Sequence, residues 1–146
     1  MIFNHRFRVK AALSDVASFH RLAASMSAIT PPPLRVQILN APVKLSDGDE
    51  MDFSLQFGPF RLRWIARIKD VSAAGFTDQL LRGPFQEWNH RHSFNRVDTN
   101  ITEVSDQISA QLKKSFGGRL LGWGLWLGLP FLFAYRGWKT RALLEK

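Results

Sequence analysis

The chain has 146 residues, of which 45% are hydrophobic and 22% charged, which is typical of one folded domain and excludes a disordered chain. It contains no cysteine, which excludes disulfides, thiolate metal sites and a cysteine nucleophile. The net charge is +8, but the basic residues are spread along the chain without a DNA- or RNA-binding motif. We therefore expect no nucleic-acid partner and interpret the charge as a solvated basic sheet face.

The N-terminal segment predicts a strand followed by a helix. At residues 2–10 apolar and basic residues alternate, as a half-buried strand requires, and this segment lacks the continuous apolar run of a signal peptide. We therefore expect one domain at residues 1–146 in the cytoplasm. Ser14 is the expected N-cap of a helix that runs to about Met26, because apolar residues recur there at helical spacing. Three consecutive prolines at 31–33 end it.

Six successive strands are expected after the prolines, joined by short turns that contain Gly or Pro. They are expected at residues 34–39, 51–57, 60–70, 75–81, 85–97 and 99–112. Consecutive strands with tight turns indicate an antiparallel sheet, and such a sheet usually buries one face. In the strand at 60–70, the inward set is expected to be Phe60, Leu62, Trp64, Ala66 and Ile68.

The C-terminal segment predicts one long helix, at residues 120–144, after a break at Gly117 and Gly118. Its first part, 120–135, carries no charge. These residues would extend roughly 24 Å as a helix, less than the roughly 30 Å hydrocarbon core of a bilayer, and its glycines and proline weaken it further. We therefore favour a helix that a curved antiparallel sheet grips, an α+β architecture, over a membrane span.

The apolar C-terminal helix lacks a polar outer stripe, which a helix lying on a sheet normally has. Trp123 and Trp126 are candidates for its outward side. Phe131 and Trp138 extend the aromatic pattern, and the basic residues beside them are Arg136, Lys139 and Arg141. This pattern suits peripheral contact with an anionic membrane, and a homodimer contact would serve equally well.

Several polar residues fall on the apolar side of their strands. In the strand at 85–97, Trp88 and Phe94 predict an inward face that also carries His90 and His92. The same argument on the two neighbouring strands turns Asp78 inward beside Phe76, and Thr102 and Asp106 inward beside Val104. Buried polar groups must be paired, so these side chains are expected to converge.

Three interpretations of this polar cluster stay open. The side chains form a self-satisfied hydrogen-bond network, or they anchor the polar end of a ligand in a mostly apolar pocket. In the third, His90 and His92 bind a metal with Asp106 or Asp78, but without cysteine or a Glu-x-x-His motif this pattern is weak, and we expect neither metal nor cofactor. The candidates for acid–base catalysis are His90, His92 and Asp106. The expected ligand-binding residues are Trp64, Phe76, Asp78, Trp88, His90, His92, Phe94, Thr102, Val104, Asp106, Leu125 and Leu129.

The order of short motifs resembles a known family. These motifs are Thr30-Pro31-Pro32, the strand around Trp64, Phe76-x-Asp78, Gly83-Pro84-Phe85, Trp88-x-His90-x-His92-x-Phe94, Thr102-x-Val104-x-Asp106 and Phe133-x-Tyr135-Arg136. Together they look like the small bacterial ligand-binding proteins of the SRPBCC superfamily, the START-like group that includes polyketide cyclases and dehydratases.

The resemblance implies a helix-grip fold, with six or seven curved antiparallel strands around a long C-terminal helix and an apolar cavity between them. It implies a hydrophobic or amphipathic small-molecule ligand, with a cyclase or dehydratase using a histidine base as the alternative. Some members are fused to sugar-epimerase-like domains. Leu80 and Ala110 depart from the family pattern, which usually has glutamine and tyrosine there. Both changes make the expected pocket more apolar and weaken the case for catalysis.

Overall fold

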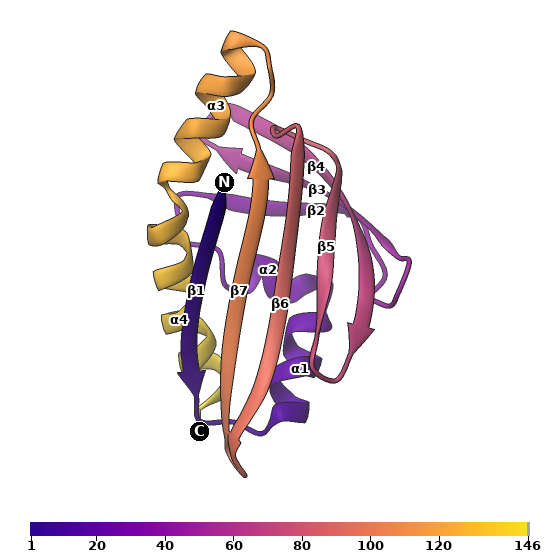
Figure 1. The fold of residues 1–146 in the computed structure, drawn as a ribbon, viewed down its shortest axis with the longest axis vertical. Coiled ribbons are helices and arrows are strands. Elements are labelled where there is room, and N and C mark those ends of the chain that lie inside the picture. Colours follow the sequence, from indigo (N-terminus) through magenta and orange to yellow (C-terminus); the bar gives the residue numbers. More distant parts are fainter. Residues whose placement is uncertain (146) are drawn as a thin grey trace.

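Seven strands form one antiparallel sheet in the order β1-β7-β6-β5-β4-β3-β2 (Figure 1). The structure is a computed structural model and describes residues 1–145. The elements are β1 Ile2–Val9, α1 Leu13–Arg21, α2 Ala23–Ala28, β2 Arg35–Asn40, β3 Glu50–Phe57, β4 Phe60–Ser72, β5 Gly75–Arg82, β6 Glu87–Asp98, β7 Ile101–Gln111, α3 Phe116–Leu127 and α4 Leu129–Leu144. The predicted antiparallel α+β architecture is confirmed.

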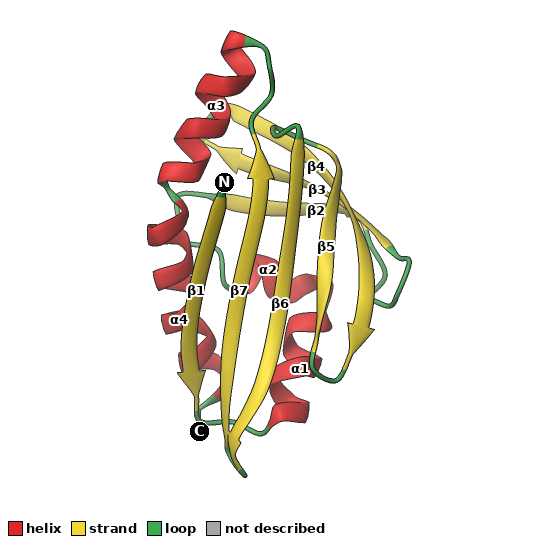
Figure 2. Ribbon diagram, viewed as in Figure 1, coloured by secondary structure: helices red, strands yellow, loops and turns green. Residues whose placement is uncertain are grey.

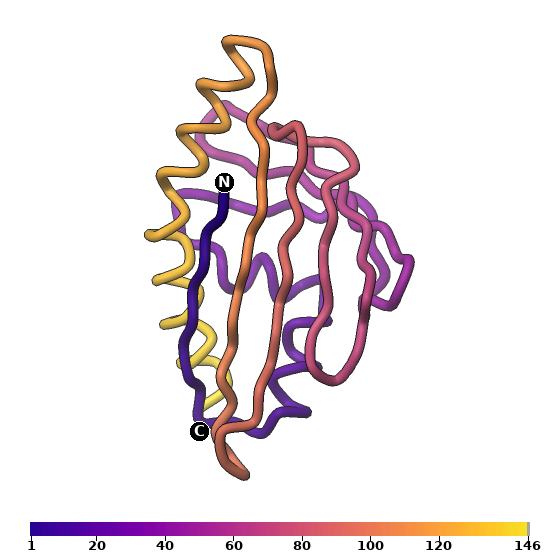
Figure 3. The backbone as a smooth tube through the Cα atoms, in the orientation of Figure 1, coloured from indigo at the N-terminus to yellow at the C-terminus, as the bar shows by residue number. Residues whose placement is uncertain are grey.

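The sheet is strongly curved, and the helices lie on its concave side. Figure 2 shows β2, β3 and β4 crossing behind the long strands β5, β6, β7 and β1. Helices α3 and α4 follow one another beside β1, while α1 and α2 lie behind the long strands. The end of α4 lies beside the end of β1 (Figure 3). There the Lys10 backbone N–H donates to Glu145 Oε2 at 2.7 Å.

The C-terminal segment is two helices and not the one long helix that the sequence predicted. It also begins earlier, at Phe116, where Ser115 caps the first turn by accepting a hydrogen bond from the Gly118 N–H at 3.2 Å. Gly117 and Gly118 therefore belong to the helix and do not precede it. The interruption falls at Gly128, and Pro130 follows in the first turn of α4, where its missing N–H costs little.

The predicted helix from Ser14 to Met26 is also divided. Ala12 and not Ser14 stands at the N-cap, without a side-chain cap. The division is at Leu22, whose extended backbone forms a β-bridge with Lys44. This pairing with a distant segment overrides the local helical pattern.

Strand parity holds for most of the inner face. Trp64, Ala66 and Ile68 are buried, and the fully buried side chains include Phe94 and Val104. Phe60, the first residue of β4, lies on this face as predicted and lines the cavity between the sheet and the helices, although it is 70% exposed. Gly75 fixes the approach of β5 to β6, since a Cβ there would lie 1.9 Å from the His92 carbonyl oxygen.

Candidate ligand-binding cavity

A cavity of about 410 Å³ lies between the concave face of the sheet and the helices. Eight of the predicted ligand-binding residues line it: Trp64, Phe76, Asp78, Trp88, His90, His92, Leu125 and Leu129. Most of the wall is aromatic or aliphatic. Gly124 and Gly128 also face the cavity, and a Cβ at Gly124 would meet no atom within 4 Å, so the absence of these side chains leaves space open.

The other four predicted residues do not line the cavity. Phe94 and Val104 lie in the hydrophobic core, where the ring of Phe94 packs 4.9 Å from that of His20. Thr102 donates its hydroxyl hydrogen to the Ala11 carbonyl at 2.8 Å, so its polar group is used in joining β7 to the segment after β1. Asp106 does not line the cavity, but it contacts both His90 and His92, which do.

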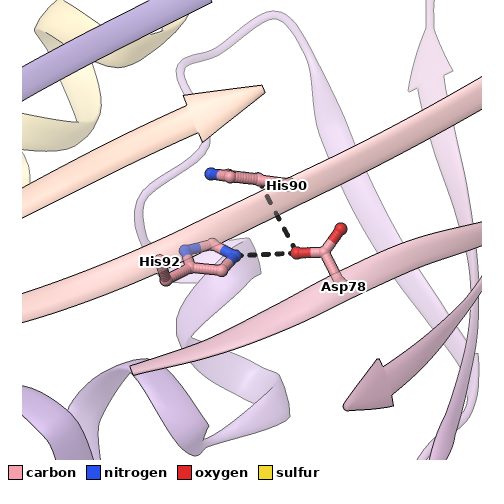
Figure 4. A group of neighbouring side chains, drawn as sticks. All are labelled: Asp78, His90 and His92. Carbon is pink, nitrogen blue, oxygen red and sulfur yellow. Dashed lines mark hydrogen bonds and ion pairs between the residues drawn. The ribbon is translucent and has the colours of Figure 1, made fainter. Parts of the chain in front are cut away.

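The polar part of the wall is a cluster of two histidines and two aspartates. His90 Nε2 lies 2.8 Å from Asp106 Oδ1. His92 Nε2 lies 2.7 Å from Asp78 Oδ2, and Figure 4 shows this contact between β6 and β5. Each carboxylate also approaches the second imidazole, with His90 Nδ1 3.6 Å from Asp78 Oδ2 and His92 Nδ1 3.2 Å from Asp106 Oδ1. Four of the five polar side chains predicted to converge therefore do so, and Thr102 does not, because its hydroxyl donates to the Ala11 carbonyl.

The antiparallel register explains how the cluster forms. Asp78 on β5 stands opposite His90 on β6, and Asp106 on β7 stands opposite His92. Residues two apart on a strand share a face, so each carboxylate reaches both the directly opposite imidazole and the diagonal one. The shorter contact is the diagonal one in each case. The two imidazole centroids are 3.7 Å apart.

Burial and pairing give the two histidines different charges. Burial by itself lowers the pKa of His92, but its contacts with Asp106 and Asp78 outweigh this and raise the pKa to about 9. Burial and the neighbouring cationic His92 hold the pKa of His90 below its usual value. Burial by itself raises the pKa of Asp78 and of Asp106. The neighbouring histidines lower these pKa values by more, so both lie below the usual value for an aspartate. At neutral pH His92 is thus cationic, His90 neutral and both carboxylates ionised.

A metal ion would compete with this hydrogen-bond network. One atom each from Asp78, His90 and His92 lies within 4.8 Å of the others, a spacing that a divalent cation can use. The same oxygen of Asp78 already pairs with His92 Nε2, so a cation would have to displace a proton and break that contact. Two hydrogen bonds, between His90 and Asp106 and between His92 and Asp78, already join these residues without a metal.

Sequence reasoning missed two charged or titratable residues of the wall, Arg136 and His20. Arg136 follows Phe133 by three positions and so shares its helix face, which is the signal that could have identified it. His20 lies four positions after Val16, and its Nδ1–H donates to the Val16 carbonyl oxygen at 2.8 Å. Burial, more than any other influence, lowers the pKa of His20 to about 4, so it is neutral.

Solved structures with very different sequences share this architecture. A START superfamily protein from Mycobacterium smegmatis has a TM-score of 0.67 at 11% identity, over 99% of this chain and 97% of that one. An aromatase/cyclase from Streptomyces has a TM-score of 0.68 at 14% identity, over 98% of this chain and 95% of that one. The chain has the START-like helix-grip fold. No protein-family model and no curated protein matches the sequence.

The START-like fold also occurs as part of a longer protein. A nucleoside-diphosphate sugar epimerase from Corynebacterium glutamicum matches with a TM-score of 0.65 at 23% identity, over 96% of this chain but 28% of that chain. The fold that the sequence motifs predicted is confirmed. Fold alone does not identify a ligand, because one fold serves many functions.

The outer side of the C-terminal helices carries a stripe of exposed apolar residues. These residues, which we call the outer stripe, are Phe116, Leu120, Trp123, Leu127, Phe131 and Trp138. Trp126 was predicted to share this side, but it packs inward, with its ring 6.3 Å from that of Phe3 and 6.4 Å from that of Trp88. Within residues 1–145, no helix has the length and apolarity needed to cross a membrane.

Proposed function

We propose that the chain binds a hydrophobic or amphipathic small molecule in the cavity. The observation that carries this proposal is a space of about 410 Å³ with a mostly apolar wall and one polar region. Ligand sites in proteins usually measure roughly 300–1,000 Å³ and combine an apolar lining with a few polar groups. The aromatic rings of Trp64, Phe76 and Trp88 would contact the apolar body of the ligand, and the polar cluster would face its polar end.

Filling the cavity at Gly124 tests this proposal. The substitution Gly124→Phe adds a ring at an open position of the cavity wall and is expected to weaken binding of N-phenyl-1-naphthylamine, a neutral apolar fluorophore, by more than about tenfold. Gly117→Phe is the matched control, because Gly117 is also a helical glycine with open space around it but does not line the cavity. A fluorophore that does not bind the unaltered protein, or binds both variants equally, would contradict the proposal.

A catalytic role is the second candidate, and one observation favours His90 over His92 for it. His92 is protonated at neutral pH and so cannot accept a proton, whereas His90 is neutral and its Nε2 is held by Asp106. If Nε2–H donates to Asp106, Nδ1 is left as the basic atom. For any substrate that this chain is found to convert, His90→Gln is expected to reduce turnover by about 100-fold or more. Unchanged turnover would exclude His90 as the base.

Contact with an anionic membrane surface is a third candidate, which the outer stripe favours. Residues 107–144 contain no Asp or Glu, and Lys113, Lys114, Arg119 and Lys139 lie in this segment. An apolar stripe among basic residues suits anionic lipid, since each basic residue near such a surface contributes about 1 kcal/mol. A two-fold homodimer through the same stripe would instead bring like charges together.

Vesicle sedimentation tests the membrane candidate. The protein is expected to sediment with vesicles of phosphatidylglycerol and phosphatidylcholine, and more than about tenfold less with phosphatidylcholine alone. Replacing Leu127 and Phe131 together by Glu should abolish sedimentation, because both side chains are exposed in the outer stripe. Val43→Glu is the control, since Val43 is equally exposed elsewhere. Equal sedimentation with both lipid mixtures would rule the candidate out.

A further inference from the structure

Arg136 places a guanidinium group at the wall of the cavity. It lies on α4, three residues after Phe133, and its Cζ stands 5.2 Å from the centroid of the Phe133 ring. Residues at this spacing share a helix face, so Arg136 lies on the same side of α4 as Phe133, and its side chain is partly buried. It lines the same cavity as Asp78, His90 and His92.

Among residues 1–145, the guanidinium of Arg136 has neither a hydrogen-bond acceptor nor an ion-pair partner. Its Nε is buried without a hydrogen-bond acceptor, and the described residues provide neither a hydrogen bond nor an ion pair to the rest of the group. Burial lowers the pKa of Arg136, and the nearby Asp106 and Asp78 only partly offset this. A buried donor without a partner costs free energy, and buried charges in proteins are normally paired.

The nearby carboxylates do not supply the missing partner. Asp106 is engaged by His90 at 2.8 Å and Asp78 by His92 at 2.7 Å, and both accept from the imidazoles. In the polar region of the cavity, Arg136 is therefore the cation that no carboxylate contacts. This arrangement differs from the exposed pairs elsewhere on the sheet, such as Arg63 with Asp52 at 2.6 Å, in which the arginine has a direct acidic partner.

We propose that the ligand carries a carboxylate at its polar end and that this carboxylate pairs with Arg136. The inference rests on the proposed ligand-binding function and specifies the class of ligand, an apolar molecule that ends in a carboxylate. The planar guanidinium offers two parallel N–H donors, which match the two oxygens of a carboxylate. Asp78 and Asp106 repel the ligand carboxylate, so it must contact Arg136 directly. The apolar body of the ligand then extends along the aromatic wall.

A matched pair of probes tests this inference on the unaltered protein. Dodecanoate and dodecanol have the same alkyl chain and differ at the polar end, and each is titrated against bound N-phenyl-1-naphthylamine. Dodecanoate is expected to displace the fluorophore at a concentration at least about tenfold lower than dodecanol. The variant Arg136→Met should lose this preference, so that dodecanoate and dodecanol displace the fluorophore at similar concentrations.

Two further variants keep the test specific. Arg136→Lys retains the charge without the planar fork, so it should keep part of the preference for dodecanoate. Arg119→Met removes an exposed arginine of α3 that does not line the cavity, and it should keep the whole preference. If Arg136→Met fails to fold, Arg136→Lys and the comparison of probes on the unaltered protein still decide the question.

The outcomes separate this inference from the proposed function. Equal affinity for dodecanoate and dodecanol, or a preference that Arg136→Met leaves intact, overturns the inference and leaves the ligand-binding function standing. The same conclusion follows if the fluorophore binds and neither probe displaces it. A fluorophore that does not bind overturns the proposed function, and the inference fails with it.

Discussion

The substitution Asp106→Asn is expected to lower the free energy of unfolding by about 3–5 kcal/mol, because it removes one partner from a buried, hydrogen-bonded charge cluster. Asp106 is buried, and its carboxylate lies 2.8 Å from His90 Nε2 and 3.2 Å from His92 Nδ1. Asparagine has nearly the same shape but no charge. The cationic His92 would then keep only Asp78 as its counter-ion. Chemical denaturation monitored by tryptophan fluorescence measures the loss.

Two control substitutions locate the effect. Asp52→Asn breaks an exposed ion pair with Arg63, and exposed pairs contribute little to stability, so this variant should unfold close to the unaltered protein. Asp78→Asn should fall between the two, because Asp78 is more exposed than Asp106 but pairs with the mostly buried His92, whereas Asp52 pairs with the exposed Arg63. If Asp106→Asn costs no more than Asp52→Asn, the cluster does not hold the sheet together in the way that its geometry indicates.

Strand alternation made the polar cluster predictable from the sequence. A strand has a side-chain period of two, so burial of Trp88 and Phe94 determines the side on which His90 and His92 lie unless a bulge intervenes. The register between β5, β6 and β7 is regular through the cluster, and the bulges of β4 and β6 fall elsewhere. For this reason the four side chains meet as parity alone predicted.

Parity could not distinguish the cavity wall from the solid core. Phe94 and Thr102 share the inner face with His92 and Asp106, but they lie toward the end of the sheet that α1 covers. A residue on the inner face lines the cavity only where the helices stand away from the sheet, and that distance depends on tertiary packing. The division at Leu22 has the same origin, since it depends on pairing with Lys44.

Arg136 shows a different limit of sequence reasoning. At the end of an uncharged run it resembles the basic residue that borders a membrane segment, and this interpretation placed it on the surface. Its spacing from Phe133 indicated instead that it shares a helix face with that residue. Because the preceding run is apolar on all sides, the sequence does not show which side of the helix packs on the sheet. Only the position of α4 against the sheet shows that Arg136 faces the cavity.

The stability of the folded protein is expected to fall as the pH rises from about 6.5 to about 9, because of His92. The pKa of His92 is raised from 6.5 to about 9 in the folded protein. Between these values the native state holds a proton that the unfolded state has released. Its stabilisation is therefore complete below pH 6.5 and lost as the pH rises through 9. A shift of this size corresponds to about 3 kcal/mol. Denaturation at a series of pH values measures it.

Two histidine variants test whether His92 causes this loss of stability at alkaline pH. His92→Gln should remove it, whereas His20→Gln should retain it, because the pKa of His20 is lowered to about 4 and its contribution therefore lies between about pH 4 and 6.5. A stability that stays level from pH 6.5 to 9 in the unaltered protein would mean that His92 is neutral when folded. The two carboxylates would then lack their imidazolium, and Arg136, which contacts neither, would be the remaining cation in the cavity wall. An added ligand carboxylate would meet stronger repulsion there, so the same measurement also bears on the class of ligand that the cavity can hold.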